Sequence, residues 1–96
     1  MNKIICFAVS LSGHDRGEIF AVCGEDENYC FLADGKGRTL QKPKRKNRKH
    51  VQFIRRIPKE LMSQAASAEH DSDVVHLLRL YKKLQSGNTD AGMKIV

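Results

Sequence analysis

Apolar and polar residues alternate over the first third of the chain. Apolar side chains occupy every second position from Ile5 to Leu11, which predicts a β-strand with one buried face. Two further apolar runs, at 18–23 and 29–33, are separated by the polar stretch Glu25–Asn28. Because so short a polar connection favours a tight turn, these two runs are predicted to pair as antiparallel strands.

Two more short strands are expected further along, at 38–40 and 51–54. The residues between them include Pro43, whose missing N–H argues against a central strand there. Five short strands joined by tight turns indicate a small barrel rather than an open sheet. Barrel closure would hide strand edges that a small sheet cannot otherwise protect.

The residues after Pro58 have a helical pattern. Good helix formers fill 59–68, with the proline at their start. Asp71 supplies a capping residue for a second helix, and Gly87 is its predicted end. One face of that helix is apolar, at Val74, Leu77, Leu78, Tyr81 and Leu84. This face is expected to pack on the barrel, and the alternative is that it docks a protein partner or a second copy of the chain.

The predicted fold is therefore mainly β, a five-stranded barrel with one or two C-terminal α-helices. Ninety-six residues suffice for one small domain with an appendage. The expected parts are a barrel at 1–57 that carries a basic segment at 36–56, a helical extension at 58–86 and a flexible tail at 87–96.

Positive charge is concentrated in the middle of the chain. The 17 Lys and Arg residues outnumber the 11 Asp and Glu residues, for a net charge of +6. No acidic residue occurs from Gly35 to Lys59, whereas six precede this stretch and five follow it. Six cations fall within the eight residues 42–49. Such segregation suits a partner that is negative over many ångströms, and a nucleic-acid backbone is the commonest.

Cysteine, histidine and acidic residues show no pattern typical of a metal site or a catalytic site. The three cysteines leave one unpaired in any disulfide scheme, which favours a reducing, cytoplasmic compartment. They form no Cys-x-x-Cys, and the four histidines lack paired spacing, so no zinc site, cofactor or enzymatic activity is expected. No apolar run reaches the ~18 residues of a membrane span, and the N-terminus is interpreted as a strand rather than a signal peptide.

The segment 9–17 and the apolar run after it resemble a KOW motif, in which a glycine-containing loop joins two strands. Two further segments keep the order of such proteins, YCFLADGK at 29–36 and KPKRKNRKHVQ at 42–52. Together, residues 5–57 resemble the small bacterial KOW-domain RNA-binding proteins, which are related to KOW-type proteins of the large ribosomal subunit. The resemblance implies an SH3-like barrel that binds structured RNA, such as ribosomal RNA, with the loop 13–17 facing it.

Two groups of basic residues are predicted to contact RNA. In the loop 13–17, glycines let backbone amides approach a phosphate. In the basic segment, cations can follow the phosphate backbone, and planar side chains can stack on an unpaired base. The predicted RNA-binding residues are His14, Arg16, Lys36, Arg38, Lys42, Lys44, Arg45, Lys46, Arg48, Lys49, His50, Arg55 and Arg56. The alternatives are a plain turn in which Asp15 satisfies local amides, and a solvated basic linker.

The predicted function is that of a non-catalytic RNA-binding protein. The rival is a protein-interaction module whose basic tract meets an acidic protein, and DNA is a third candidate partner. Phe53 is interpreted as a core residue rather than a base-stacking one. Because clustered like charges repel, replacing Lys44, Arg45, Lys46 and Arg48 with Ser is predicted to leave stability nearly unchanged.

Overall fold

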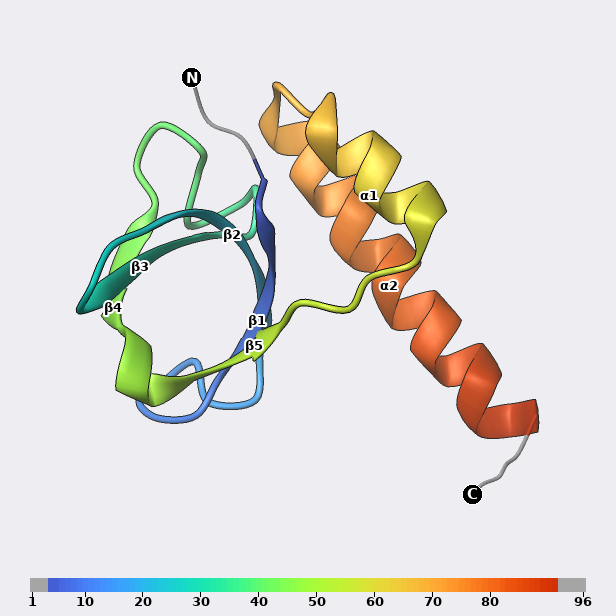
Figure 1. The fold of residues 1–96 in the computed structure, drawn as a ribbon, viewed down its shortest axis with the longest axis horizontal. Coiled ribbons are helices and arrows are strands. Elements are labelled where there is room, and N and C mark those ends of the chain that lie inside the picture. The colour runs from blue at the N-terminus through green and yellow to red at the C-terminus, as the bar shows by residue number, and fades with distance from the viewer. Residues whose placement is uncertain (1–3, 92–96) are drawn as a thin grey trace.

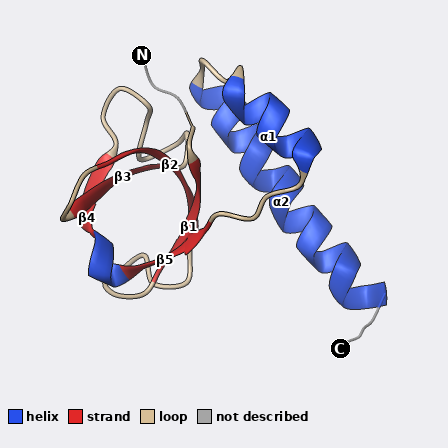
Figure 2. Cartoon of the chain, in the orientation of Figure 1, coloured by secondary structure: helices blue, strands red, loops and turns tan. Residues whose placement is uncertain are grey.

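The computed structural model describes residues 4–91 as a curled sheet of five strands with two helices beside it (Figure 1). The elements are β1 (Cys6–Ser10), β2 (Ile19–Glu25), β3 (Tyr29–Ala33), β4 (Lys44–Asn47), the short 3-10 helix η1 (Arg48–His50), β5 (Val51–Ile54), α1 (Lys59–Ala66) and α2 (Asp71–Ala91). The strand order is β4-β3-β2-β1-β5, and every neighbouring pair is antiparallel. The sheet forms a half-barrel, and both helices lie on one side of it (Figure 2).

The predicted pairing of 18–23 with 29–33 is confirmed. Val22 lies opposite Leu32, and the register shifts between Val22 and Gly24. The turn between the strands is held by Asp26, whose carboxylate accepts hydrogen bonds from the amides of Asn28 and Tyr29 at 2.9 and 2.8 Å. Short polar turns between apolar runs were therefore a sound guide to this hairpin.

The predicted strand at 38–40 is wrong, since the fourth strand is β4 within the basic segment. Residues 34–38 instead form a tight turn, in which the Asp34 carboxylate accepts from the amides of Lys36 and Arg38 at 2.9 and 3.0 Å. The strand begins directly after Pro43 and lies at the edge of the sheet. An edge position is where a proline beside a strand is tolerated, as the sequence indicated.

Strand β1 buries both of its faces rather than one. Its inner face, Cys6, Ala8 and Ser10, is almost fully buried inside the half-barrel. Phe7 points to the outer face and is also fully buried, because the helices cover it. Ile5 and Leu11, which the alternation placed on the buried face, are 41% and 48% exposed. The apolar alternation located the strand but chose the wrong inner face.

The second helix packs on the sheet, in agreement with the prediction that its apolar face is covered within the chain. Its buried residues Val74, Leu77, Leu78 and Tyr81 share a core with the outer face of the sheet and with α1. The ring of Tyr81 meets that of Phe7 edge-on at a centroid distance of 5.2 Å. Leu84, the last residue of the predicted apolar face, is 44% exposed and is not among the buried residues of this core.

The predicted helix end at Gly87 is wrong, because α2 continues to Ala91. A helical glycine costs only about 1 kcal/mol, so a single glycine does not have to end a helix. Of the expected flexible tail, 92–96 lies outside the described residues. The first helix begins after Pro58, as predicted, but it ends at Ala66. Neither helix has the length and hydropathy that crossing a membrane requires, within the described part of the chain.

Candidate nucleic-acid interface

The loop between β1 and β2 is fixed to the edge strand β4 by charge. Gly13 and Gly17 have φ of 85° and 87°, which confirms the predicted need for positive φ in this loop. The Asp15 carboxylate lies between them along the chain. It accepts from Lys44 Nζ at 2.7 Å and from Lys46 Nζ at 2.8 Å. The Asp15 carboxylate therefore binds two distant lysines rather than the local amides of the plain-turn alternative. We refer to these two ion pairs as the ion-pair anchor.

Lys46 is an internal residue of this anchor. Its ammonium donates to Ser10 Oγ, to the Ser12 carbonyl oxygen and to Asp15 Oδ1, each at 2.8 Å. Lys46 is only 9% exposed, and an ammonium has three N–H donors, so none remains for a phosphate. The prediction that Lys46 contacts RNA is therefore not supported by its position.

The environment of Asp15 stabilises its ionised form. Burial by itself raises the pKa of Asp15, but hydrogen bonds from the two lysines and from Ser10 outweigh it and hold that pKa well below its ordinary value. Asp15 therefore stays ionised at neutral pH, and its negative charge is balanced locally by Lys44 and Lys46.

A second ion-pair cluster lies at the other end of β1, beside Cys6. Arg55 donates hydrogen bonds to the Glu25 carboxylate from both of its terminal nitrogens, at 2.8 and 3.0 Å, and Arg48 donates to the same carboxylate at 2.6 Å. These hydrogen bonds, chiefly those from Arg55, hold the pKa of Glu25 below its ordinary value. The guanidinium carbons of Arg48 and Arg55 also lie 5.0 and 4.4 Å from the centroid of the Phe53 ring. Arg48 and Arg55, two of the predicted RNA-binding residues, are thus engaged in contacts within the fold.

Phe53 is half-buried and packs against the inner core of the half-barrel. The favoured interpretation of Phe53 as a core residue agrees with this position. Because two guanidinium groups already lie near its ring, a base has little room to stack there.

One surface combines the loop 13–17 with the end of the basic segment. The amide of Leu11 donates to the carbonyl oxygen of His50 at 2.8 Å, which places η1 against this loop. The exposed cations and histidines of the loop 13–17, of β4 and of η1 are His14, Arg16, Arg45, Lys49 and His50. Among residues 4–85, whose side chains the structure describes, none of the five has an ion-pair partner. We refer to these five residues as the basic face.

The remaining predicted residues lie apart from the basic face. Lys36 and Arg38 belong to the turn 34–38, which rests on the first turns of α2. Lys42 and Arg56 are exposed, before β4 and after β5. The thirteen predicted residues therefore do not form one continuous site.

Sequence reasoning missed the acids that organise the basic segment, Asp15 and Glu25. Their partners lie 29 and 31 residues away for Asp15, and 23 and 30 for Glu25. No local pattern reports contacts at such separations. Sequence analysis also did not identify the cations of α2 that lie near Lys36 as site residues. Their spacing along the helix was the only sequence pattern that could have indicated them.

Nothing in the described residues suggests a metal centre, because no group of three or more His, Cys, Asp or Glu side chains converges there. Burial raises the pKa of the free thiols of Cys6, Cys23 and Cys30, which disfavours reactive thiolates. No model of a known protein family matches the chain, and no curated protein matches it either.

Proposed function

We propose that the chain is a non-catalytic, cytoplasmic RNA-binding protein built on an SH3-like KOW barrel. The observation that carries the proposal is the basic face, in which two segments remote in the sequence share one surface. Asp15 is the loop's acid, and Lys44 and Lys46 neutralise it internally. The exposed cations of the basic face therefore keep their full charge for a partner.

Backbone geometry in the loop adds donors to this surface. The amides of Gly13, His14 and Asp15 donate to no other group among the described residues, and Gly13 and His14 are exposed. Successive free amides beside a glycine with positive φ can approach a phosphate closely. Arg16 follows directly and supplies a forked donor for the same phosphate.

A planar group for an unpaired base lies on the outer side of β4. The guanidinium carbon of Arg45 lies over the Tyr29 ring, 4.6 Å from its centroid, in a cation–π contact. RNA, unlike duplex DNA, commonly offers unstacked bases for such surfaces. An exposed planar group of this kind favours RNA with loops or bulges over a duplex.

The first test is the dependence of binding on salt. If roughly three phosphates are neutralised, by Arg16, Arg45 and Lys49, log K falls with log salt at a slope of about −2.1 to −2.7. Binding to a folded RNA, a single strand, duplex DNA and an acidic polypeptide is compared by filter retention. A slope near zero, or preference for the polypeptide, would overturn the proposal and favour the protein-interaction rival.

A pair of double variants tests the position of the surface. Removing Arg16 and Lys49 in R16Q/K49Q is expected to make the salt slope shallower by about 1.4 to 1.8, since two phosphate contacts are lost. The control K59Q/K83Q changes the net charge equally but lies on the helices. It is expected to keep the parent slope. Equal losses in both variants would mean that net charge, and not the basic face, determines binding.

A further inference from the structure

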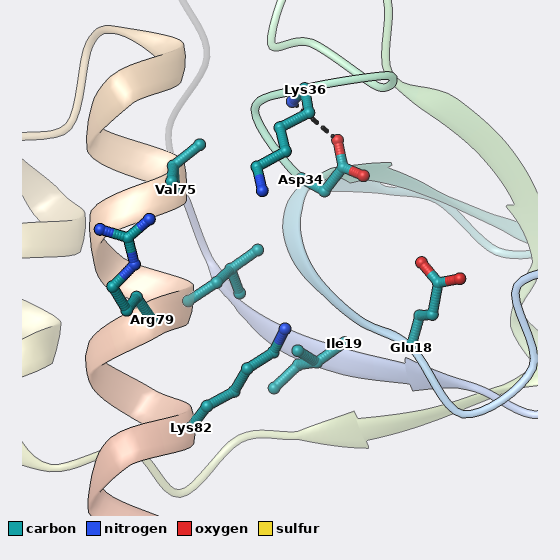
Figure 3. Close-up of a pocket in the computed structure, with 8 residues that line it drawn as sticks. Glu18, Ile19, Asp34, Lys36, Val75, Arg79 and Lys82 are labelled. Atoms are coloured by element: carbon teal, nitrogen blue, oxygen red, sulfur yellow. Dashed lines mark hydrogen bonds between the residues drawn. The ribbon is translucent and has the colours of Figure 1, made fainter.

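A second group of cations surrounds a cavity between α2 and the turn 34–38 (Figure 3). The cavity has a volume of about 450 Å³ and is lined by Glu18, Ile19, Asp34, Lys36, Val75, Leu78, Arg79 and Lys82. Its walls therefore come from β2 and its preceding loop, from the turn and from one face of the helix. It shares no residue with the basic face.

The fold sets this cavity in place through Gly35. Its φ is 81°, and a Cβ added there would lie 2.5 Å from the carbonyl oxygen of Asp71 and 2.8 Å from Val75 Cγ2. The backbone of the turn thus rests directly on the first turns of α2, where only glycine fits. The Asp71 carboxylate also accepts from the amide of Leu40 at 2.8 Å. Lys36, the residue after Gly35, is consequently held beside the helix.

Lys36, Arg79 and Lys82 line the cavity, and none of the three forms an ion pair with a described acid. Lys36 comes from the turn, and Arg79 and Lys82 come from α2, three positions apart and so on one side of the helix. In Figure 3 the ammonium groups of Lys36 and Lys82 point into the space between turn and helix. Within the described part of the chain, none of the three side chains has a hydrogen-bond or ion-pair partner.

The two acids of the cavity do not neutralise these cations directly. Asp34 is committed to its own turn, because its Oδ1 accepts the amides of Lys36 and Arg38. Glu18 is exposed, and in Figure 3 its carboxylate points away from Arg79 and Lys82. The cavity therefore keeps an excess of positive charge on its helix side.

We propose that this cavity binds a phosphate group. A phosphate has several strong acceptor oxygens, so it can meet two ammonium groups and a guanidinium at once. Ile19, Val75 and Leu78 add apolar walls that strengthen such contacts by excluding water. The phosphate is supplied either by an RNA backbone, which would extend the proposed RNA-binding surface to α2, or by a free phosphomonoester.

Inorganic phosphate is the direct probe. It is titrated into the ¹⁵N-labelled full chain at constant ionic strength, with sodium chloride as the reference. The expected result is saturable shifts of the amide signals of Lys36, Arg79 and Lys82. The variant R79Q/K82Q should lose saturation, whereas K83Q, which removes a neighbouring charge that does not line the cavity, should retain it. Shifts equal to those in chloride, or unchanged in R79Q/K82Q, would overturn the proposal.

A second arm identifies the source of the phosphate. If it belongs to RNA, K82Q makes the salt slope of RNA binding shallower by about 0.7 to 0.9, and K83Q does not. If it belongs to a small molecule, adenosine monophosphate saturates the same amide shifts and the RNA slope is unchanged. A parent chain that binds no RNA would refute the proposed function alone, because the titration with inorganic phosphate still decides the cavity. Melting curves confirm that the variants are folded.

Discussion

Replacing Lys46 with Met tests whether the basic segment is part of the fold. The substitution keeps most of the side-chain length and removes the ammonium that joins Ser10, Ser12 and Asp15. Breaking a buried ion pair by removing one partner costs about 3–5 kcal/mol. Lys44 still pairs with Asp15 in the variant, and the Asp15 side chain is 13% exposed. We therefore expect a loss of about 2–4 kcal/mol.

Thermal unfolding followed by circular dichroism measures this loss. In a domain of this size, each 1 kcal/mol lowers Tm by roughly 4–8 °C, so K46M should melt roughly 8–32 °C below the parent. The matched control is K49M, since Lys49 is exposed and its side chain has no partner among the described residues. Its unfolding free energy should change by less than about 0.5 kcal/mol. If K46M melts at the same temperature as K49M, the ion-pair anchor contributes nothing to stability. The sequence-based prediction that the basic tract lies entirely at the surface would then stand.

Three further outcomes follow from the geometry. The pKa of Asp15 is lower in the folded chain than in the unfolded chain, so the ionised carboxylate stabilises the fold above the ordinary value of 3.8. This stabilisation is lost as the pH falls below that value. The difference in unfolding free energy between the parent and D15N should therefore become smaller in acid. Alanine at Gly37 should change the melting temperature little, and alanine at Gly17 should cost about 1 kcal/mol because its φ is positive. Alanine at Gly35 should cost clearly more, because Gly35 has a positive φ and also meets the helix. Arg45→Lys should weaken binding to single-stranded RNA and change the salt slope little, since lysine keeps the charge but lacks the planar group. An affinity equal to that of the parent would exclude base stacking at Arg45.

Local patterns account for the parts of the fold that were predicted correctly. Strands β2, β3 and β5 and the start of α1 depend on periodicity, short turns and Pro58, and all of these act within a few residues. The predicted cap at Asp71 is wrong, because Asp71 lies in the first turn of α2 and its carboxylate accepts from the distant amide of Leu40. The positive φ of Gly13 and Gly17 was likewise predictable, because two glycines flanking polar residues are typical of such loops.

The errors occur where distant residues decide the outcome. Strand β4 has no apolar alternation, and it is held by hydrogen bonding to β3 and by the pairing of its lysines with Asp15. The choice of inner face in β1 depended on helices far along the chain, which bury Phe7 from outside. The cavity beside α2 depends on Gly35 resting on that helix, a contact across more than one element that no spacing in the sequence reveals.

The alternation of a β-strand also explains why the basic tract cannot be treated as uniform. Successive side chains of a strand point to opposite faces, so Lys44 and Lys46 turn inward to Asp15 while Arg45 turns outward over Tyr29. The following turn of η1 then places Lys49 outside. A count of cations in the sequence therefore overstates the number available to a phosphate backbone. The salt slope of binding should follow the smaller number of exposed cations, since only those release counterions from RNA.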